Sequence, residues 1–303
     1  MLQRFSFFRF HQLRHQYSKM SSANFGTYKR AIVRQIPDSI RDHSEAHEDR
    51  GFQGLPIYAP INLEKARQEH EVYTQTLRDL GLEVTVVPAD ESTPDCPFVE
   101  DICVVVGNKA LLTRPQGAAR RKEVDTIEKV LTDLGLEVHR IRNKRATLEG
   151  GDVVFTGHEF FVGDSACSNP KGHKILAETF PEYPVLSIPL DPPKFHLKGV
   201  ICMAAPGVLA VGESKWGVRA WKKIQKHAKF TYEPLWLPDK VFADHTCDVI
   251  FFNGNLVHCR TQEGAESVKR FADRFPDVNR VELTIGELEK VDAGLTCCSV
   301  LLP

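Results

Sequence analysis

Two adjacent cysteines, Cys297 and Cys298, lie in an apolar segment that follows Asp292 and Gly294. Successive residues of a strand face opposite sides, so at most one of these thiols can face a cleft. The Asp-Ala-Gly turn and Thr296 favour Cys297 as that thiol. A cysteine acts as a nucleophile when a histidine from elsewhere in the chain lies beside it in the fold. A buried structural cysteine is the alternative interpretation.

Three further segments are polar where the pattern expects apolar residues. They are DCPFVED at residues 95–101, LEGGD at 148–152 and FHLK at 195–198. Carboxylates bind a substrate cation through charge-assisted hydrogen bonds, and a histidine exchanges protons near neutral pH. For any one segment, capping of turns at the rim of a sheet is the competing interpretation.

A metal site is the rival chemistry for the same atoms. His196, Cys297 and the nearby carboxylates could ligate zinc, but the short ligand spacing of a structural zinc site is absent. The sequence contains neither a GxGxxG nor a P-loop pattern, which disfavours nucleotide binding. We therefore expect no resident metal and no nucleotide cofactor.

Composition sets the class of protein. The 303 residues are 42% hydrophobic and 26% charged, as in a globular protein with a sizeable core, and the formal net charge of −1 attracts neither nucleic acid nor an anionic membrane. No run of eighteen apolar residues predicts a transmembrane helix. Eight cysteines without a CxxC pair favour free thiols in a reducing compartment.

The first twenty residues differ from the rest. They carry Arg4, Arg9, Arg14 and Lys19 without an acidic residue, which is typical of a mitochondrial presequence. A disordered basic tail, or a true start at Met20, explains the same pattern. We expect residues 1–22 to lie outside the fold and residues 23–303 to form one domain. The protein is then expected to be cytoplasmic, or mitochondrial if the leader is a presequence.

An internal repeat predicts the architecture. LRDLGLEVTVV at 77–87 returns as LTDLGLEVHRI at 131–141, and each copy follows a helical pattern, over 63–80 and 121–134. Gly81 and Gly135 fall where a helix C-cap needs a left-handed residue, and a strand follows each glycine.

The segments after these strands repeat as well. Hairpin patterns occupy 97–112 and 146–163, a third copy spans 196–212 with a helical pattern over 214–229, and a fourth covers 248–285. Residues 26–36 could complete a ring with the segment at 296–302. The unit is strand–strand–helix–strand, about five times, and such units commonly close radially. The expected fold is α/β, with several small mixed sheets, and equivalent positions of the copies would lie close together at one end.

Four segments together resemble the dimethylarginine dimethylaminohydrolase (dimethylargininase) family. They are FVEDICVVVGNKALLTRP, LEGGDVVFTGHEFFVG, HLKGVICM and ELEKVDAGLTCCSVL, and the resemblance runs from about Phe25 to Leu302. It implies a guanidino-group-modifying (pentein) fold, a five-bladed α/β propeller of ββαβ units. It also implies a cysteine hydrolase of amidine carbon–nitrogen bonds that converts dimethyl- and monomethyl-L-arginine to L-citrulline, with a bearing on nitric oxide regulation. The resemblance implies no cofactor, and it implies zinc at the active site only as an inhibitor.

The resemblance also implies residue roles. Cys297 corresponds to the nucleophile, His196 to the acid/base and Glu149 to the carboxylate that orients the histidine. The implied substrate contacts are Asp95, Glu100 and Asp101 for the guanidinium and α-amino groups, Arg120 for the carboxylate, and Val291 and Asp292 near the nucleophile. A methylated arginine is the implied small-molecule partner, and the chain is expected to be a monomer or a homodimer.

Three departures bear on the amino-acid end of the substrate. Cys167 stands where the family has a second carboxylate-binding arginine, Glu45 stands near a lid position usually held by leucine, and RPQGAARR replaces RPGAxxRR. Arg120 is then the main expected anchor, with Lys171 as a possible substitute. Arginine deiminase, agmatine deiminase or amidinotransferase chemistry on the same fold is one alternative, and a catalytically weak binding protein is another.

Overall fold

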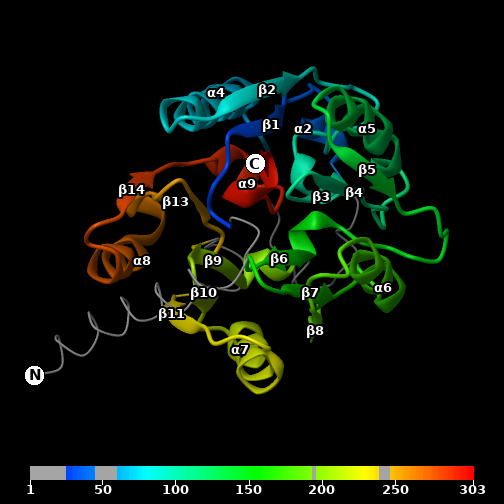
Figure 1. Cartoon of the computed structure of the whole chain (residues 1–303). Coiled ribbons are helices and arrows are strands. Elements are labelled where there is room, and N and C mark those ends of the chain that lie inside the picture. Colours follow the sequence, from blue (N-terminus) through cyan, green and yellow to red (C-terminus); the bar gives the residue numbers. More distant parts are fainter. Residues whose placement is uncertain (1–24, 45–59, 193–195, 239–245) are drawn as a thin grey trace, which may run out of the picture.

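The structure is a computed structural model that describes residues 25–44, 60–192, 196–238 and 246–303. In these parts of the chain, five three-stranded sheets stand in a ring around a central axis (Figure 1). The strands are β1 (Arg30–Arg34), β2 (Glu83–Val87), β3 (Cys103–Val106), β4 (Lys109–Leu112), β5 (Glu137–Arg140), β6 (Val153–Phe155), β7 (Phe160–Asp164), β8 (Val185–Pro189), β9 (Ile201–Ala205), β10 (Val208–Gly212), β11 (Glu233–Leu237), β12 (Ile250–Phe252), β13 (Asn255–His258), β14 (Asn279–Glu282) and β15 (Val300–Leu302). The expected five-bladed α/β propeller is confirmed.

Each sheet, or blade, has the same internal order. The first and second strands are antiparallel, joined as a hairpin in four of the sheets and brought together from the two ends of the fold in the sheet of β15, β1 and β2, and the third strand runs parallel to the second, as β5 does to β4. One long helix connects the second strand to the third and lies on the outer rim of the ring (Figure 1). These helices are α4 (Leu63–Asp79), α5 (Glu123–Asp133), α6 (Pro170–Thr179), α7 (Lys215–His227) and α8 (Thr261–Arg274), and the shorter helices are α2 (Ile40–His43) and α9 (Gly286–Glu289).

The helix ends follow the capping signals. Gly81 and Gly135, just past α4 and α5, have φ angles of +94° and +82°, in the region that favours glycine. Helix α5 begins two residues later than its pattern suggested, because residues 120–122 form a 3₁₀ turn, η2 (Arg120–Lys122). None of the helices in the described ranges is long and apolar enough to cross a membrane.

The first strands of the blades face the axis. β3 contacts β15, and β9 contacts both β6 and β12. Short 3₁₀ turns lead into four of the five first strands: η1 (Val99–Ile102) into β3, η3 (Gly150–Asp152) into β6, η4 (Leu197–Gly199) into β9 and η5 (Leu295–Cys298) into β15. We call these turns, with the residue or two before them, the lead-in turns. Because the blades are arranged in a ring, the lead-in turns meet at one end of the axis.

The ring closes where β15 pairs antiparallel with β1, in the register Arg30 with Leu302 and Ile32 with Val300. This confirms the expected pairing of the two ends of the fold. Ile32, Val300 and Leu302 pack into one core with Ile127 of the next blade. Burial of a large aliphatic side chain stabilises a fold by about 1.5–3 kcal/mol. The closing strand is therefore part of the core and not a loose end.

Candidate active site

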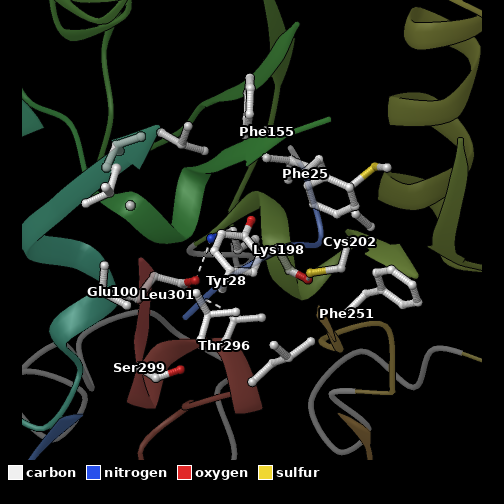
Figure 2. A pocket seen from close by; sticks show the side chains of 18 of the residues that line it. Phe25, Tyr28, Glu100, Phe155, Lys198, Cys202, Phe251, Thr296, Ser299 and Leu301 are labelled. Carbon is white, nitrogen blue, oxygen red and sulfur yellow. Dashed lines mark hydrogen bonds and ion pairs between the residues drawn. The ribbon is translucent and has the colours of Figure 1, made fainter. Parts of the chain in front are cut away.

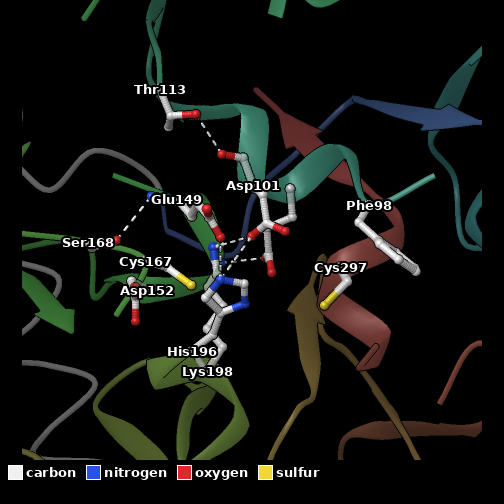
Figure 3. Close-up of polar contacts among 12 residues, drawn as sticks. Phe98, Asp101, Thr113, Glu149, Asp152, Cys167, Ser168, His196, Lys198 and Cys297 are labelled. Carbon is white, nitrogen blue, oxygen red and sulfur yellow. Dashed lines mark hydrogen bonds and ion pairs between the residues drawn. The ribbon is translucent and has the colours of Figure 1, made fainter. Parts of the chain in front are cut away.

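The lead-in turns bring the predicted site residues together. η1 contacts both η3 and η5, and η3 contacts η4. Glu100 and Asp101 come from η1, Glu149 directly precedes η3, His196 directly precedes η4, and Cys297 lies in η5. Figure 3 shows His196 and Glu149 on one side of the site and Cys297 on the other, with its sulfur directed towards the histidine side. Equivalent positions of four blades thus build one site.

Cys297 and Cys298 differ in their exposure, in the sense that the sequence suggested. Cys297 keeps 9% of its surface exposed, whereas Cys298 has 0% and packs in the core. The backbone N–H of Gly294 donates to Cys297 Sγ at 3.3 Å. Burial, and then the carboxylates of Asp248 and Glu100, raise the pKa of the Cys297 thiol well above its ordinary value. The thiol is therefore protonated while the site is empty.

His196 lies among carboxylates. Its Nε2 is 2.7 Å from Glu149 Oε2 and 3.8 Å from Asp101 Oδ1. Burial opposes the charged imidazole, but Asp101, Cys167 and Glu149 outweigh burial and raise the pKa of His196 well above its ordinary value. Glu149 is itself held in place, because its Oε1 accepts from the N–H of Gln116 at 2.9 Å. His196 is an imidazolium in this arrangement.

Asp101 lies between His196 and Arg120. It is buried, and its Oδ1 accepts from the N–H of Gly151 at 3.0 Å while Oδ2 pairs with Arg120 at 2.6 Å. Burial raises its pKa, but His196 and Arg120 outweigh burial, so the pKa of Asp101 is lowered. Asp101 is therefore a fixed negative charge that stabilises the imidazolium.

Glu100 is paired as well. Its Oε1 is 2.5 Å from Lys198 Nζ, and its Oε2 accepts from Thr296 Oγ at 2.7 Å. Asp95 is buried and accepts from Ser44 Oγ at 2.6 Å. The carboxylates predicted to hold a substrate cation are thus buried and fixed by hydrogen bonds, next to the residue that precedes Cys297.

Arg120, the expected anchor of a substrate carboxylate, is engaged by protein groups, and its contact with a substrate stays a prediction. Its guanidinium donates to Asp101 at 2.6 Å, to Glu123 at 3.2 and 3.1 Å, and to the backbone carbonyls of Asp95 and Phe98 at 3.3 and 3.0 Å. Arg120 is 6% exposed, and turning it towards a ligand would remove the arginine from two buried carboxylates, at a high energetic cost. In this position Arg120 ties η1 to α5 and positions Asp101.

Val291 and Asp292 lie between α9 and η5. Val291 packs in the core, and Asp292 has a φ of +64°, which a non-glycine residue adopts rarely. Their contact with a substrate stays a prediction. Glu45 and residues 1–22 lie outside the described residues.

One buried acid was missed by the sequence analysis. Asp248 precedes β12, and its two carboxylate oxygens accept from the N–H and the hydroxyl of Thr296 at 2.7 and 3.3 Å. Burial and then Glu100 raise the pKa of Asp248 to about 7. The sequence does contain a signal for Asp248. It stands just before the first strand of the fourth copy of the repeat, at the position that Asp101 and Asp152 hold in the first two copies.

A cavity of about 160 Å³ borders the site (Figure 2). Its lining includes the aromatic rings of Phe25, Tyr28, Phe155 and Phe251. Glu100, Lys198 and Thr296 also line the cavity. The ion pair between Glu100 and Lys198 therefore belongs both to the cavity and to the lead-in turns.

Comparison with known proteins defines the class. The fold matches that of a mutant of DDAH from Pseudomonas aeruginosa in complex with citrulline, with a TM-score of 0.77 over 91% of this chain and 100% of that chain at 21% identity. The N-terminal domain of ArgZ, an arginine dihydrolase from cyanobacteria, gives a TM-score of 0.74 over 90% and 97% of the two chains at 16% identity. The chain thus has the fold of the guanidine-modifying propellers.

Sequence comparison defines the family. Residues 37–209 match the family model described as eukaryotic N,N dimethylarginine dimethylhydrolase. The putative hydrolase DDAH2 of Homo sapiens is 35% identical over 91% of this chain and 95% of its own length. N(G),N(G)-dimethylarginine dimethylaminohydrolase of Pseudomonas aeruginosa is 26% identical over 82% and 90% of the two chains. The chain belongs to the dimethylarginine dimethylaminohydrolase family of hydrolases.

Proposed function

We propose that this protein hydrolyses dimethyl- and monomethyl-L-arginine to L-citrulline and dimethylamine or methylamine, with Cys297 as nucleophile and without a cofactor. The observation that carries this proposal is the pairing of His196 with Glu149 and Asp101 at the end of the axis where Cys297 also lies. A thiol, a protonated base and fixed acids are what cleavage of a cationic guanidine requires.

The acids bind the substrate first. Asp95, Asp101 and Glu100 accept charge-assisted hydrogen bonds from the guanidinium, and the added positive charge lowers the pKa of the Cys297 thiol, which burial and then Asp248, Glu100 and Asp101 had raised. The thiol proton leaves to solvent, and the thiolate attacks the guanidinium carbon. Binding of the cation thus activates the nucleophile.

His196 then acts twice. As imidazolium it protonates the departing amine of the tetrahedral adduct, which leaves a thiouronium on Cys297 and a neutral imidazole. The imidazole takes a proton from water as the hydroxide adds to the thiouronium carbon. Collapse of this second adduct breaks the carbon–sulfur bond, passes the hydroxyl proton to solvent, releases citrulline and restores the thiolate. Glu149 holds the imidazole in place through both steps.

A second candidate substrate is an amine that lacks the carboxylate, such as agmatine. It is favoured because Arg120 is engaged by Asp101 and Glu123, and Cys167 carries no positive charge. Neither position supplies the anchor for an α-carboxylate that the resemblance implies.

A substrate panel tests the proposal. Arginine, agmatine and mono- and dimethylarginine are incubated with the protein, and citrulline, ammonia and methylamines are measured. Release of dimethylamine with citrulline from dimethylarginine supports the proposal, and ammonia release from agmatine alone supports the second candidate. Absence of products from every compound would leave a binding protein.

A further inference from the structure

An aspartate recurs just before the first strand of a blade and bonds to the lead-in turn of the next blade. Asp101, before β3, accepts through Oδ1 from the N–H of Gly151 in η3 at 3.0 Å. Asp248, before β12, accepts through Oδ1 from the N–H of Thr296 in η5 at 2.7 Å. The lead-in turns of η3 and η5 carry the orienting acid and the nucleophile. Each of these aspartates therefore holds a turn that supplies a residue of the site.

Asp152 is the third aspartate of this kind, and it holds the turn of the histidine. It directly precedes β6, is fully buried, and accepts through Oδ1 from the N–H of Leu197 in η4 at 3.0 Å. Leu197 is the residue after His196. A hydrogen bond from a backbone N–H to a carboxylate is charge-assisted and roughly twice as strong as a neutral one. Asp152 therefore fixes the backbone from which the imidazole projects.

The second oxygen of Asp152 reaches the loop between β7 and α6. Its Oδ2 accepts from Ser165 Oγ at 2.6 Å, and the same hydroxyl accepts from the N–H groups of Cys167 and Ser168 at 3.0 and 3.1 Å. Ser168 Oγ in turn accepts from the N–H of Glu149 at 3.0 Å (Figure 3). One carboxylate thus connects the backbone beside the imidazole to the backbone of the acid that orients the imidazole.

The carboxylate of Asp152 is confined and charged. A Cβ at Gly163 in β7 would collide with Asp152 Oδ1, so the strand backbone lies directly against the carboxylate and leaves it no room to shift. Burial raises the pKa of Asp152 to about 6, and the positive charge of His196 opposes this rise. The attraction between the two charges is mutual. Asp152 therefore favours the imidazolium form of His196 as well as its position.

We propose that Asp152 is the positioning residue of the acid/base pair, an inference that rests on the proposed function. Its carboxylate holds the imidazole of His196 and the carboxylate of Glu149 at their separation of 2.7 Å through both proton transfers. Because Asp152 has no exposed surface, it acts through these two residues and not on the substrate. A displacement of about 1 Å at a catalytic group can lower a rate by about 10²-fold.

Replacement of Asp152 should lower turnover without weakening substrate binding. Asp152→Ala removes the acceptor for Leu197 and for Ser165 and should lower kcat by about 10²-fold. Asp152→Asn retains an oxygen for the N–H of Leu197 but not the charge, and should lower kcat by about tenfold. KM should change little, because the acids proposed to bind the guanidinium are untouched. Ser165→Ala, which cuts only the branch towards Glu149, should be milder than Asp152→Ala and replaces it if that variant does not fold.

Glu159→Gln is the matched control. Glu159 belongs to the same blade, is also buried, and also accepts from backbone N–H groups of the next blade, those of Lys229 and Phe230, at 3.1 Å. Among the described residues, its carboxylate bonds to the segment between α7 and β11 and to no lead-in turn. Glu159→Gln should therefore lower the melting temperature and leave kcat unchanged.

The titration of His196 supplies a readout without reference to activity. The protein is isotope-labelled at the Cε1 carbon of its histidines, the signal of His196 is assigned by its absence from His196→Ala, and its pKa is measured by nuclear magnetic resonance. Asp152→Asn removes a charge that favours the imidazolium, so the pKa of His196 should fall. The other groups that raise this pKa, Asp101, Cys167 and Glu149, remain in place. The control variant should leave the pKa of His196 unchanged.

Two results overturn the proposal. One is an unchanged kcat in Asp152→Asn and Ser165→Ala, and the other is a pKa of His196 that is the same in Asp152→Asn as in Glu159→Gln. Either result would reduce Asp152 to a tie between two blades. A protein that is inactive on every guanidine, but in which Asp152→Asn still lowers the pKa of His196, would refute the proposed function and not the positioning of the imidazole.

Discussion

Carboxylates favour the protonated form on both sides of the site, but with opposite results, and burial adds to their effect on the thiol while it opposes their effect on the histidine. On the thiol side, burial and then Asp248 and Glu100 raise the pKa of Cys297, which leaves a neutral and unreactive thiol. On the histidine side, Asp101 and Glu149 raise the pKa of His196, which leaves a charged imidazolium ready to donate. The same negative charge thus prepares the acid and restrains the nucleophile. A cationic substrate offsets that charge and so releases the restraint on the thiol, while Glu149 still pairs with the imidazolium.

The two sides also differ in how their acids are held. Glu100 and Asp248 both accept hydrogen bonds from Thr296, so the thiol side is organised around one hydroxyl. On the histidine side, Glu149 bonds to the imidazole directly. Substitutions on the two sides should therefore differ in their effects on activity, stability and pH dependence. Five substitutions test this difference, in order from the largest expected effect to the smallest.

Replacing the nucleophile removes the thiol side altogether. Cys297→Ser should abolish citrulline formation, because an alcohol is far less ionised and less nucleophilic than a thiol. Cys298→Ser, in the core, is the control and should keep most of the activity. Comparable loss in both variants with unchanged melting would mean that the nucleophile is misassigned.

Removing the imidazole abolishes both proton transfers. His196→Ala should lower kcat by about 10²–10⁴-fold for each role it loses. Because the acids on the thiol side are untouched, the KM should change little. Steady-state kinetics on the best substrate checks this, and activity within tenfold of the unmodified protein would exclude His196 from the mechanism.

Arg120 should matter mainly for stability. Arg120→Ala leaves Asp101 and Glu123 buried without their partner, and loss of one member of a buried pair costs about 3–5 kcal/mol. Urea unfolding measures this cost. Arg121→Ala, whose arginine donates to the backbone carbonyls of Pro115 and Gln116 and pairs with no carboxylate of the described residues, is the matched control and should cost much less. A raised KM without loss of stability would support Arg120 as a substrate anchor.

Two substitutions of the orienting acid, Glu149, separate the effect of its charge from the effect of its geometry. Glu149→Gln keeps the shape but removes one of the charges that raise the pKa of His196, so that pKa falls. The imidazolium is then lost at lower pH, and the alkaline limb of the kcat profile should move to lower pH. Residues that orient a functional histidine typically contribute about 10–100-fold. Glu149→Asp should be milder, and a Gln variant with an unshifted profile would exclude the orienting role.

Substitution of Asp248 should show how far its charge holds the Cys297 thiol in the protonated form. Asp248→Asn retains an acceptor for the N–H of Thr296 but removes a charge that raises the pKa of Cys297. Alkylation of Cys297 by iodoacetamide, followed by mass spectrometry, should become a few-fold faster at a fixed pH. The unmodified protein should also lose stability as the pH rises from the ordinary Asp range to about 7, the raised pKa of Asp248, whereas the variant should lack this loss. An unchanged alkylation rate would contradict the restraint.

The sequence predicts the blades well because their signals are local. Gly81 and Gly135 end their helices where a left-handed residue is required, and hairpin turns separate the strands that follow. The ring itself follows from repetition, since one copy of the unit cannot bury its own apolar face.

The site is predicted less completely because its contacts join different blades. Cys297, His196 and Glu149 were found because each directly precedes or occupies a turn with a recognisable motif. The ion pairs of Arg120 with Asp101 and Glu123 were not predicted, because no local pattern indicates them. The proximity of Cys167 to His196 depends on a loop of one blade reaching the turn of the next, and nothing in either segment alone indicates it.

The closing of the ring has a consequence for the timing of synthesis. The nucleophile turn runs directly into β15, which pairs with β1, a strand made roughly 270 residues earlier. A ribosome-bound chain that has already formed the blades with Glu149 and His196 still lacks Cys297, which completes the site. The strand that closes the ring of blades is thus the one that brings the cysteine to the histidine, so closure of the ring and completion of the site depend on the same pairing.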